Sequence, residues 1–493
     1  MMVLAPEQEP LLPPDNTEIP REGDDEAVSD DYLLFVKAFF NANGAPQILI
    51  LSLFLSFGIS CTVGVIPDVM AERYAILHHQ YVGPDCSTFD RLEKPESCQA
   101  GSDDAQEAAA LSAFARNMFT LTFNSLIGSI SDVRGRKIFM VLAMILSLLS
   151  PFMLVVLQML PSIEPVWFYI FDCAGGAVNS MSISFAILSD VMPPKWRAPA
   201  FGMLLASFYI GFSFGPSFPL LMTHLWVSIA SFMLIFSAFL CSLFLLPETL
   251  PADIAEENRA RREEQEEGMG WKIMVRPITE MAILNRDSFL RLLAAGSFLS
   301  GMVYSSDIVL VVYYVEDQLN VRDSDLAQIF FIMGMLGIVI QALLLKSMIA
   351  YLGEKGLLVT SFLSGTCHNA CYALARGKRL IYVAFCLSQL TKTNFPLLSS
   401  LAANNVDKHE QGRIQGALFA LSALADAIGP IMLEYIYSHT KTTLGPGTMF
   451  AFASFLYFLG TIFVSLLPTK KIRTTTVAAT MVGEQDGLLN PFS

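Results

Sequence analysis

Residues 128–137 read Gly-Ser-Ile-Ser-Asp-Val-Arg-Gly-Arg-Lys and separate two apolar runs, one ending at Ser131 and the next beginning at Ile138. Each run can cross a bilayer as a helix, since about 20 apolar residues span the hydrocarbon core. A carboxylate followed by Gly-Arg-Lys between two such runs is typical of a short cytosolic turn between transmembrane helices. The candidate gate element therefore consists of Gly128, Asp132, Arg134, Gly135, Arg136 and Lys137.

The composition agrees with a membrane protein, because 53% of the 493 residues are hydrophobic and only 15% are charged. A soluble core of this length cannot hide so much apolar surface. Apolar stretches of about 20 residues recur along the chain. The twelve predicted spans are 47–70, 108–130, 138–160, 165–188, 199–222, 226–246, 290–315, 326–347, 357–375, 379–401, 413–436 and 446–467.

The ends of the chain are predicted to be cytosolic. The first 31 residues are acidic and Pro-rich, without the positive start and apolar run of a signal peptide. With the N-terminus inside, most of the 31 Lys and Arg residues fall in cytosolic segments. The formal net charge of −14 lies largely in the N-terminal tail and in 256–267, so it describes solvated segments and excludes nucleic acid as a partner.

The apolar pattern breaks once in the middle, which predicts two six-helix halves in an all-α membrane protein. We expect the protein to be a monomer. The predicted divisions are a cytosolic tail (1–45), an N-terminal bundle (46–249), a cytosolic linker (250–285), a C-terminal bundle (286–467) and a second cytosolic tail (468–493).

The two halves repeat a short pattern. Gly202 to Ala206, followed by Gly215-Pro216, reappears at a fixed offset as Gly416 to Ala420, followed by Gly429-Pro430. The copies fall in the fifth and eleventh predicted spans, which occupy equivalent positions if the two halves are parallel repeats. In a transporter built from such repeats, we expect the solute site to lie where the halves meet. Each Gly-Pro is either a gating hinge or a purely structural kink.

The gate element resembles the cytoplasmic loop between spans two and three of the major facilitator superfamily, except that Val133 stands at a usual basic position. The resemblance implies that Asp132 caps a helix terminus and pairs with a basic residue, latching the cytoplasmic side. Residues 185–216 and Leu246-Pro-Glu-Thr-Leu-Pro251 are similar to tetracycline/proton antiporters, the hippocampus-abundant-transcript group and proton-coupled folate transporters. This implies proton-coupled secondary transport of a small organic solute by alternating access.

Two departures leave symport and antiport both open. Pro219 stands where the antiporter pattern of span five ends in Gly, and Asp172 stands where span four usually carries Arg.

Charged residues within spans are costly and usually face a cavity or a partner. Lys392 and Asp426 lie at similar depth in spans ten and eleven and are predicted to pair, either as a proton-coupling pair or as a permanent structural one. Arg116 and Asp172 are predicted to pair within the N-terminal half. Asp307 is a further candidate, and His368 is expected to be a hydrogen-bonded core residue sooner than a titrating or metal-binding one.

Cys86 and Cys98 share the long non-cytosolic loop, where a disulfide and two free thiols are equally expected. No metal-ligand spacing, nucleotide-binding loop or nucleophile-base arrangement is present in the sequence, so neither an enzyme nor a bound metal or cofactor is expected.

Both tails carry an acidic residue four before a Leu-Leu pair, a pattern that resembles dileucine signals read by clathrin adaptors. The residues are Glu7, Leu11, Leu12, Glu484, Leu488 and Leu489. They favour an endosomal, lysosomal or vacuolar membrane. The alternative to a transporter is a membrane sensor or trafficking scaffold that keeps the fold without transport.

Overall fold

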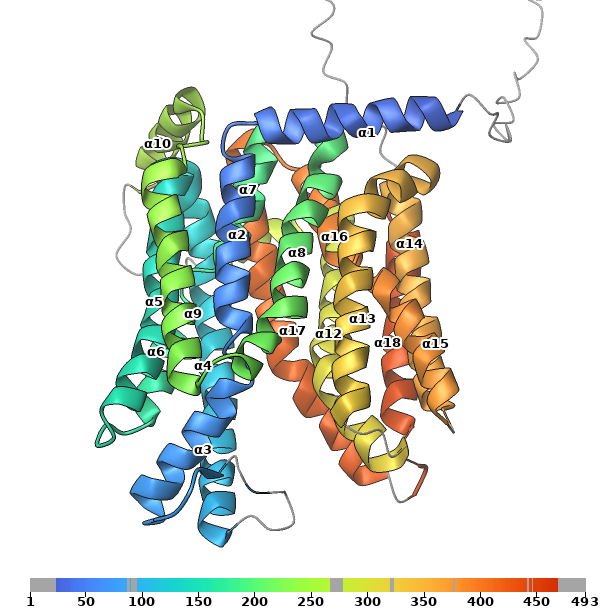
Figure 1. Ribbon diagram of the computed structural model, residues 1–493. Helices are drawn as coiled ribbons and strands as arrows, with labels where there is room; N and C mark the ends of the chain where they lie inside the picture. The colour runs from blue at the N-terminus through green and yellow to red at the C-terminus, as the bar shows by residue number, and fades with distance from the viewer. Residues whose placement is uncertain are drawn as a thin grey trace, which may run out of the picture.

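The computed structural model describes residues 24–86, 89, 95–266, 278–319, 323–375, 377–440, 443–445 and 447–468. Every regular element within these ranges is helical. Seven of the described helical segments are long and apolar enough to cross a membrane. Most helices run side by side along one direction, whereas α1 (Asp24–Asn41) lies across one end of the bundle (Figure 1).

The N-terminal half is built from helices that follow the first six predicted spans. They are α2 (Ala45–Ser60), α3 (Val65–His78), α4 (Glu96–Arg134), α5 (Arg136–Met159), α6 (Val166–Ala174), α7 (Ser180–Val191), α8 (Arg197–Phe214), the short η3 (Gly215–Leu220), α9 (His224–Leu240) and η4 (Cys241–Leu245). The three-residue η2 (Pro194–Trp196) precedes α8, and α10 (Ala252–Glu266) follows in the linker.

The C-terminal half follows the last six predicted spans. Its helices are η5 (Ala282–Asn285), α12 (Ser288–Leu319), α13 (Asp323–Ile338), η6 (Val339–Leu344), α14 (Leu345–Ala373), α15 (Lys378–Thr391), α16 (Asn394–Ala403), η7 (Lys408–Glu410), α17 (Gln411–Thr440) and α18 (Thr448–Ser465). The predicted all-α membrane fold is confirmed, and this arrangement fits the expected twelve spans.

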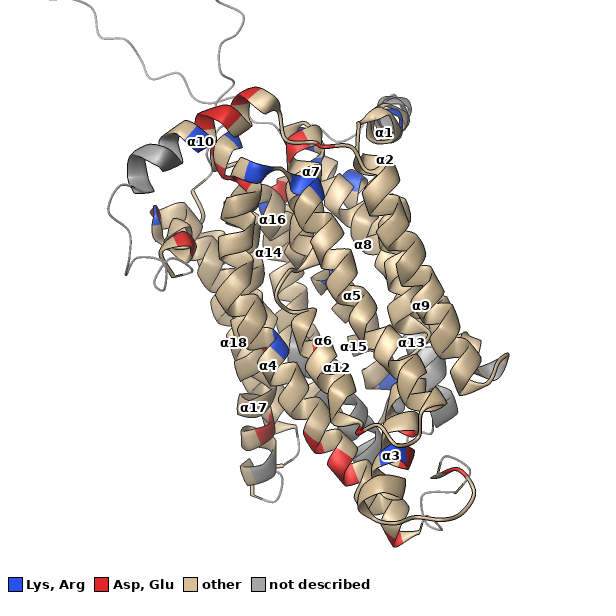
Figure 2. Ribbon diagram, turned by 90° about the vertical axis from the view of Figure 1, so that its left-hand side faces the viewer, with Lys and Arg blue, Asp and Glu red and all other residues tan. Residues whose placement is uncertain are grey.

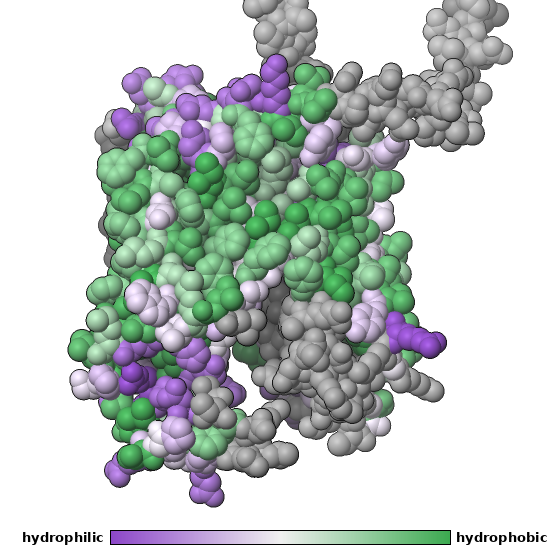
Figure 3. Space-filling view, in the orientation of Figure 1, coloured by the Kyte–Doolittle hydropathy of each residue, from purple (hydrophilic) through white to green (hydrophobic). Residues whose placement is uncertain are grey.

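Each half has its own apolar core. Phe185 and Phe201 stack with ring centroids 4.4 Å apart at the centre of the N-terminal core, and Phe362 and Tyr457 meet in the C-terminal one. The outer surface seen in Figure 3 is a broad apolar band between polar ends. Such a band is what a bundle needs in order to lie in hydrocarbon.

The repeated glycines lie where the halves touch. A Cβ on Gly202 would collide with the Gln341 carbonyl of η6, and one on Gly416 would collide with the Asn124 carbonyl of α4. Small residues at such crossings let backbones approach closely. The repeat therefore marks two contacts between the halves, α8 against η6 and α17 against α4.

The two Gly-Pro pairs are not equivalent. At Gly215-Pro216, α8 ends and the 3₁₀ segment η3 begins, whereas Gly429-Pro430 lies inside the continuous helix α17. In both pairs the glycine packs against a neighbouring helix: Gly215 against Ser60 of α2, and Gly429 against the Met302 backbone of α12. Close packing is thus common to both sites, and a break in the helix is confined to the N-terminal one.

The two ends of the molecule differ in chemistry. Charged residues lie at both ends of the bundle, and Lys and Arg are more frequent at the end that carries α1, α7 and α10 (Figure 2), the end that the Lys and Arg distribution assigns to the cytosol. At the opposite end, α3 and the start of α4 extend beyond the bundle (Figure 1), and Cys86 and Cys98 form a disulfide there.

Candidate functional site

A buried charge cluster closes the α1 end of the bundle. Arg136, whose side chain is fully buried, donates from Nη2 to Asp132 Oδ1 at 2.6 Å and from Nε to Asp190 Oδ2 at 2.8 Å. A buried guanidinium is tolerated because two carboxylates satisfy it. Sequence reasoning missed Asp190 as the third member, although its position in an otherwise apolar span was a usable signal.

Asp132 also ties the two halves together. Its Oδ1 accepts a hydrogen bond from the Gly412 amide and its Oδ2 accepts one from the Arg413 amide, both at 2.8 Å. These amides belong to the first turn of α17, where unpaired N–H groups and the helix dipole favour an anion. The structure thus places Asp132 where the family resemblance puts its helix-capping carboxylate, and the capped helix lies in the other half.

The chain turn after Asp132 is fixed by a second carboxylate. Gly135 has a φ of 100°, which favours glycine, and so allows α5 to begin directly after α4 ends. Glu248 accepts hydrogen bonds from the amides of Arg136 at 2.8 Å and Lys137 at 3.1 Å. Lys137 thus takes part in this turn through its backbone amide, and the Arg134 side chain is exposed.

A second polar contact joins the halves beside the first. Arg197, at the start of α8, donates to the Ala403 carbonyl at 3.0 Å and to Asn404 Oδ1 at 2.8 Å. It also donates to the Ser189 carbonyl within its own half at 2.8 Å. Together with Asp132, this residue joins the two halves at the α1 end.

A central cavity of about 340 Å³ lies between the halves. Its polar lining groups come from both of them and include Arg116, Asn117, Thr120, Asn179, Tyr209, Ser297, Ser300, Tyr304, Thr391, Lys392, Asn394, Ser422 and Asp426. Two helix breaks border it, one between α6 and α7 before Asn179, and one between α15 and α16 at Lys392. Discontinuous helices at mid-depth are typical of solute sites in transporters.

Lys392 does not form the predicted ion pair with Asp426. Its ammonium donates to the Met333 carbonyl at 2.9 Å and lies 4.5 Å from the ring centroid of Tyr209. The break after Thr391 turns the lysine toward α13, and its carbonyl accepts a 2.6 Å hydrogen bond from Gln341. Lys392 and Asp426 share the cavity lining without an ion pair between these two described side chains.

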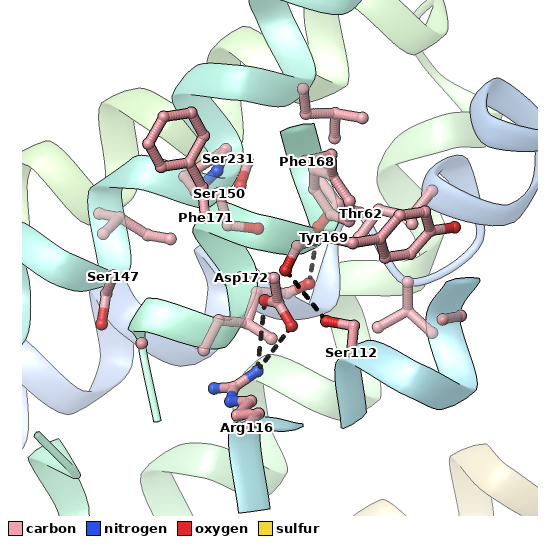
Figure 4. Close-up of a pocket in the computed structure, with 18 of the residues that line it drawn as sticks. Thr62, Ser112, Arg116, Ser147, Ser150, Phe168, Tyr169, Phe171, Asp172 and Ser231 are labelled. Carbon is pink, nitrogen blue, oxygen red and sulfur yellow. Dashed lines mark hydrogen bonds and ion pairs between the residues drawn. The ribbon is translucent and has the colours of Figure 1, made fainter. Parts of the chain in front are cut away.

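Arg116 and Asp172 do meet. Arg116 Nη1 lies 3.3 Å from Asp172 Oδ1, joining α4 to α6 (Figure 4). The pair also lines a second cavity of about 340 Å³ inside the N-terminal half, which Ser112, Ser150 and Ser231 border with hydroxyl groups (Figure 4). Because Arg116 lines both cavities, the pair forms part of the wall between them.

The remaining candidates lie away from the central cavity or outside the described side chains. His368 is fully buried, contacts the Ser364 carbonyl at 3.3 Å and packs edge-on against Tyr372 and Tyr457, as expected for a core histidine. The backbone of Asp307 belongs to α12, but its side chain is not among those that the structure describes. The six sorting residues of the tails also lie outside the described ranges. Among the described residues, no group of His, Cys, Asp and Glu is arranged to hold a metal ion.

The sequence profile of the Major Facilitator Superfamily matches residues 48–430. The chain belongs to the major facilitator superfamily. The match begins in α2 and runs through both halves to the Gly-Pro of α17. It therefore includes the Asp132–Arg136–Asp190 cluster and every described residue of the central cavity except Tyr457.

This major facilitator chain has two groups of relatives that agree with the resemblance drawn from its motifs. The hippocampus abundant transcript-like protein 1 of Bos taurus is 24% identical over 325 residues, which cover 63% of this chain and 60% of that protein. The class E tetracycline resistance protein of Escherichia coli is 24% identical over 332 residues, which cover 66% of this chain and 77% of that protein. The chain thus aligns with about three fifths of the length of its hippocampus-abundant-transcript relatives.

Solved structures show the same fold. The human organic anion transporter MFSD10 (TETRAN) superposes with a TM-score of 0.69 and 20% identity, covering 85% of this chain and 98% of that one. The E. coli fucose:proton symporter FucP superposes with a TM-score of 0.61 and 11% identity, covering 86% of this chain and 99% of that one. At these identities the likeness concerns the fold of the major facilitator superfamily.

The Arg116–Asp172 pair gives a first prediction. Both side chains are partly exposed to the cavities, so the pair is expected to add only about 1 kcal/mol to stability. Arg116→Ala and Asp172→Asn should each lower the thermal unfolding midpoint, and the double variant should lose less than the sum. The double-mutant cycle is measured on purified protein by differential scanning fluorimetry. Strict additivity of the two losses would show that the pair contributes no coupling energy.

Proposed function

We propose that this protein is a secondary active transporter that moves a small organic solute by alternating access, coupled to protons. The observation that carries the proposal is the central cavity, which both halves line at mid-depth and which the buried Asp132–Arg136–Asp190 cluster closes on one side. A site reached from one side at a time is what alternating access requires. Superfamily membership, and relatives whose names state tetracycline resistance or proton symport, support transport as the activity.

The solute we expect is a small organic anion with an apolar portion. Lys392, Arg116 and Asp426 line the cavity, the carboxylate of Asp172 offsets Arg116, and no ion pair joins the described side chains of Asp426 and Lys392. Lys392 is held only by a carbonyl and an aromatic face among the contacts described, so a solute carboxylate is a stronger partner for it. Tyr209, Phe395 and Phe419 supply apolar and aromatic surface around it. The name of the MFSD10 structure states the same class of solute for that protein.

The test of the proposal is uptake into proteoliposomes. Purified protein is reconstituted and offered a mixed pool of organic acids, with and without an imposed pH gradient, and the retained solutes are identified by mass spectrometry. Accumulation above that of empty liposomes supports transport, and a dependence on the gradient supports proton coupling. Retention equal to that of empty liposomes across the pool, in protein that remains monodisperse, would favour the non-transporting scaffold.

Asp426 is the carboxylate that we propose for proton coupling. It is half-buried, lines the cavity together with Lys392, and has Phe212 as its counterpart at the repeat offset, so the shared scaffold does not require it. Asp426→Asn keeps the shape but cannot release a proton. The variant should lose gradient-driven accumulation and keep downhill exchange of preloaded solute. Accumulation at the wild-type level would mean that another carboxylate, Asp172 or Asp307, carries the coupling proton.

We also propose an endosomal, lysosomal or vacuolar location, reached through clathrin adaptors that read the dileucine pairs of both tails. Changing Leu11, Leu12, Leu488 and Leu489 to Ala should move a tagged protein from intracellular membranes to the cell surface. Surface biotinylation and microscopy measure the shift, and Ile472→Ala with Val477→Ala supplies a matched control, because these apolar residues belong to the same C-terminal tail but lie outside its Leu-Leu pair. An unchanged distribution of the four-residue variant would show that these Leu-Leu pairs do not act as sorting signals.

A further inference from the structure

Helix α1 has an inner face that belongs to the N-terminal half. Phe35 and Phe39 are each only 1% exposed and lie in the same apolar core as Phe185 and Phe201. The ring of Phe35 also meets Trp196 of η2 edge-on, with centroids 6.2 Å apart. The sequence predicts this segment to be part of a cytosolic tail (1–45), whereas these contacts hold it against the bundle.

The same helix reaches the C-terminal half. The Tyr32 hydroxyl donates to the Ala342 carbonyl of η6 at 3.2 Å, and the Lys346 ammonium of α14 lies 5.7 Å from the Tyr32 ring centroid. Since α1 is joined to α2 and packs on Trp196, it crosses the line where α8 meets η6 and α14 (Figure 1). These contacts lie at the α1 end, the end that the Asp132 cluster closes.

The outer face of α1 is apolar and exposed. Leu33, Leu34 and Phe40 are 65%, 57% and 51% exposed, and the exposed Lys37 lies on the same side. A face of this composition is unfavourable in water and typical of helices that lie in the headgroup region of a bilayer. The position agrees, because α1 turns at Gly44, where φ is 102°, directly into α2, the beginning of the first predicted span.

We infer that α1 is a membrane-surface strap, which packs its outer face, Leu33, Leu34 and Phe40, into the phospholipid headgroup region of the cytoplasmic leaflet and joins the two halves through its inner face. The strap favours the conformation that is closed at the α1 end, because the contacts of Tyr32 with Ala342 and Lys346 cross between the halves. The lipid contact is independent of the proposed function. The effect on closure rests on the relative motion of the halves that alternating access requires.

The lipid contact is tested by electron paramagnetic resonance. In full-length protein whose six free cysteines are replaced by serine, a nitroxide is attached at Leu34→Cys and the protein is placed in phosphatidylcholine/phosphatidylglycerol nanodiscs. Oxygen, which concentrates in lipid, should relax this label more than the water-soluble reagent Ni-EDDA. The matched control is Glu256→Cys on α10, an exposed polar position at the same end, which should show the opposite order. Ni-EDDA access at Leu34 equal to that at Glu256 would overturn the lipid contact.

The bridging contact is tested by the distance between two further labels. Ile138→Cys of α5 and Tyr351→Cys of α14 are both exposed and lie in opposite halves. Tyr32→Phe removes one hydrogen bond between the halves and should raise the population of longer distances about fivefold. Leu33→Glu with Leu34→Glu should do the same by weakening the lipid contact.

The control for this measurement is Tyr81→Phe, which also removes a hydroxyl-to-carbonyl hydrogen bond, to Pro84, but within one loop at the opposite end. It should leave the distances unchanged. A distance distribution that Tyr32→Phe does not change, or that Tyr81→Phe changes equally, would overturn the strap. A shifted distribution in protein that fails the uptake test would support the strap and count against the proposed transport, so the two failures are distinguishable.

Discussion

Asp132→Asn is expected to lower the initial rate of solute uptake about thirtyfold while membrane insertion stays intact. The carboxylate accepts from two amides of α17 and pairs with Arg136, so the change weakens charge-assisted hydrogen bonds between the halves by about 2 kcal/mol. Arg136 keeps Asp190 as its counter-ion, so the N-terminal half should remain folded. The variant therefore destabilises only the conformation of the transport cycle in which Asp132 caps α17.

The matched control for this prediction is Asp190→Asn. Asp190 contacts the same guanidinium, but both of its hydrogen bonds with Arg136 stay within the N-terminal half. This variant should lower thermal stability more than it lowers uptake, since the contact is present in both conformations. Uptake is measured in proteoliposomes and insertion by fluorescence-detected size-exclusion chromatography. Wild-type uptake in Asp132→Asn would show that the cap of α17 does not control the cycle.

Lys392→Met should reduce uptake of organic acids at least about a hundredfold, because an anion in the cavity would lose a desolvated partner worth about 3 kcal/mol. Methionine keeps the length of the side chain and its apolar contact with Tyr209. Lys392→Arg retains the charge and should recover part of the activity, although its planar head fits the site beside the Met333 carbonyl less well.

Two comparisons separate solute binding from a structural role of Lys392. Lys195→Met, on the exposed η2 segment, should leave uptake unchanged. A neutral analogue of whichever acid the wild type transports should be affected less by Lys392→Met than the acid itself. Equal loss of the acid and its neutral analogue would assign Lys392 to fold stability, through the Met333 and Gln341 contacts that hold α15 and α16.

The architecture could be predicted without coordinates. Apolar runs of bilayer length, a single break in the middle and the distribution of Lys and Arg predict the helical membrane fold, because hydrocarbon leaves the backbone few other solutions. The charged turn at 128–137 and the repeated Gly pattern indicated the superfamily and the contact between the halves. Those patterns are local or periodic, so they can be recognised without coordinates.

Which side chains meet could be read only from the folded chain. Arg116 and Asp172 share a depth and do pair, whereas Lys392 and Asp426 share a depth and do not, because depth along a helix says nothing of its rotation and the break at Lys392 turns the ammonium toward Met333. The partner of Asp132 lies 280 residues away in α17. Helix α1 falls within the predicted tail, because the apolar core that buries Phe35 and Phe39 exists only in the folded bundle.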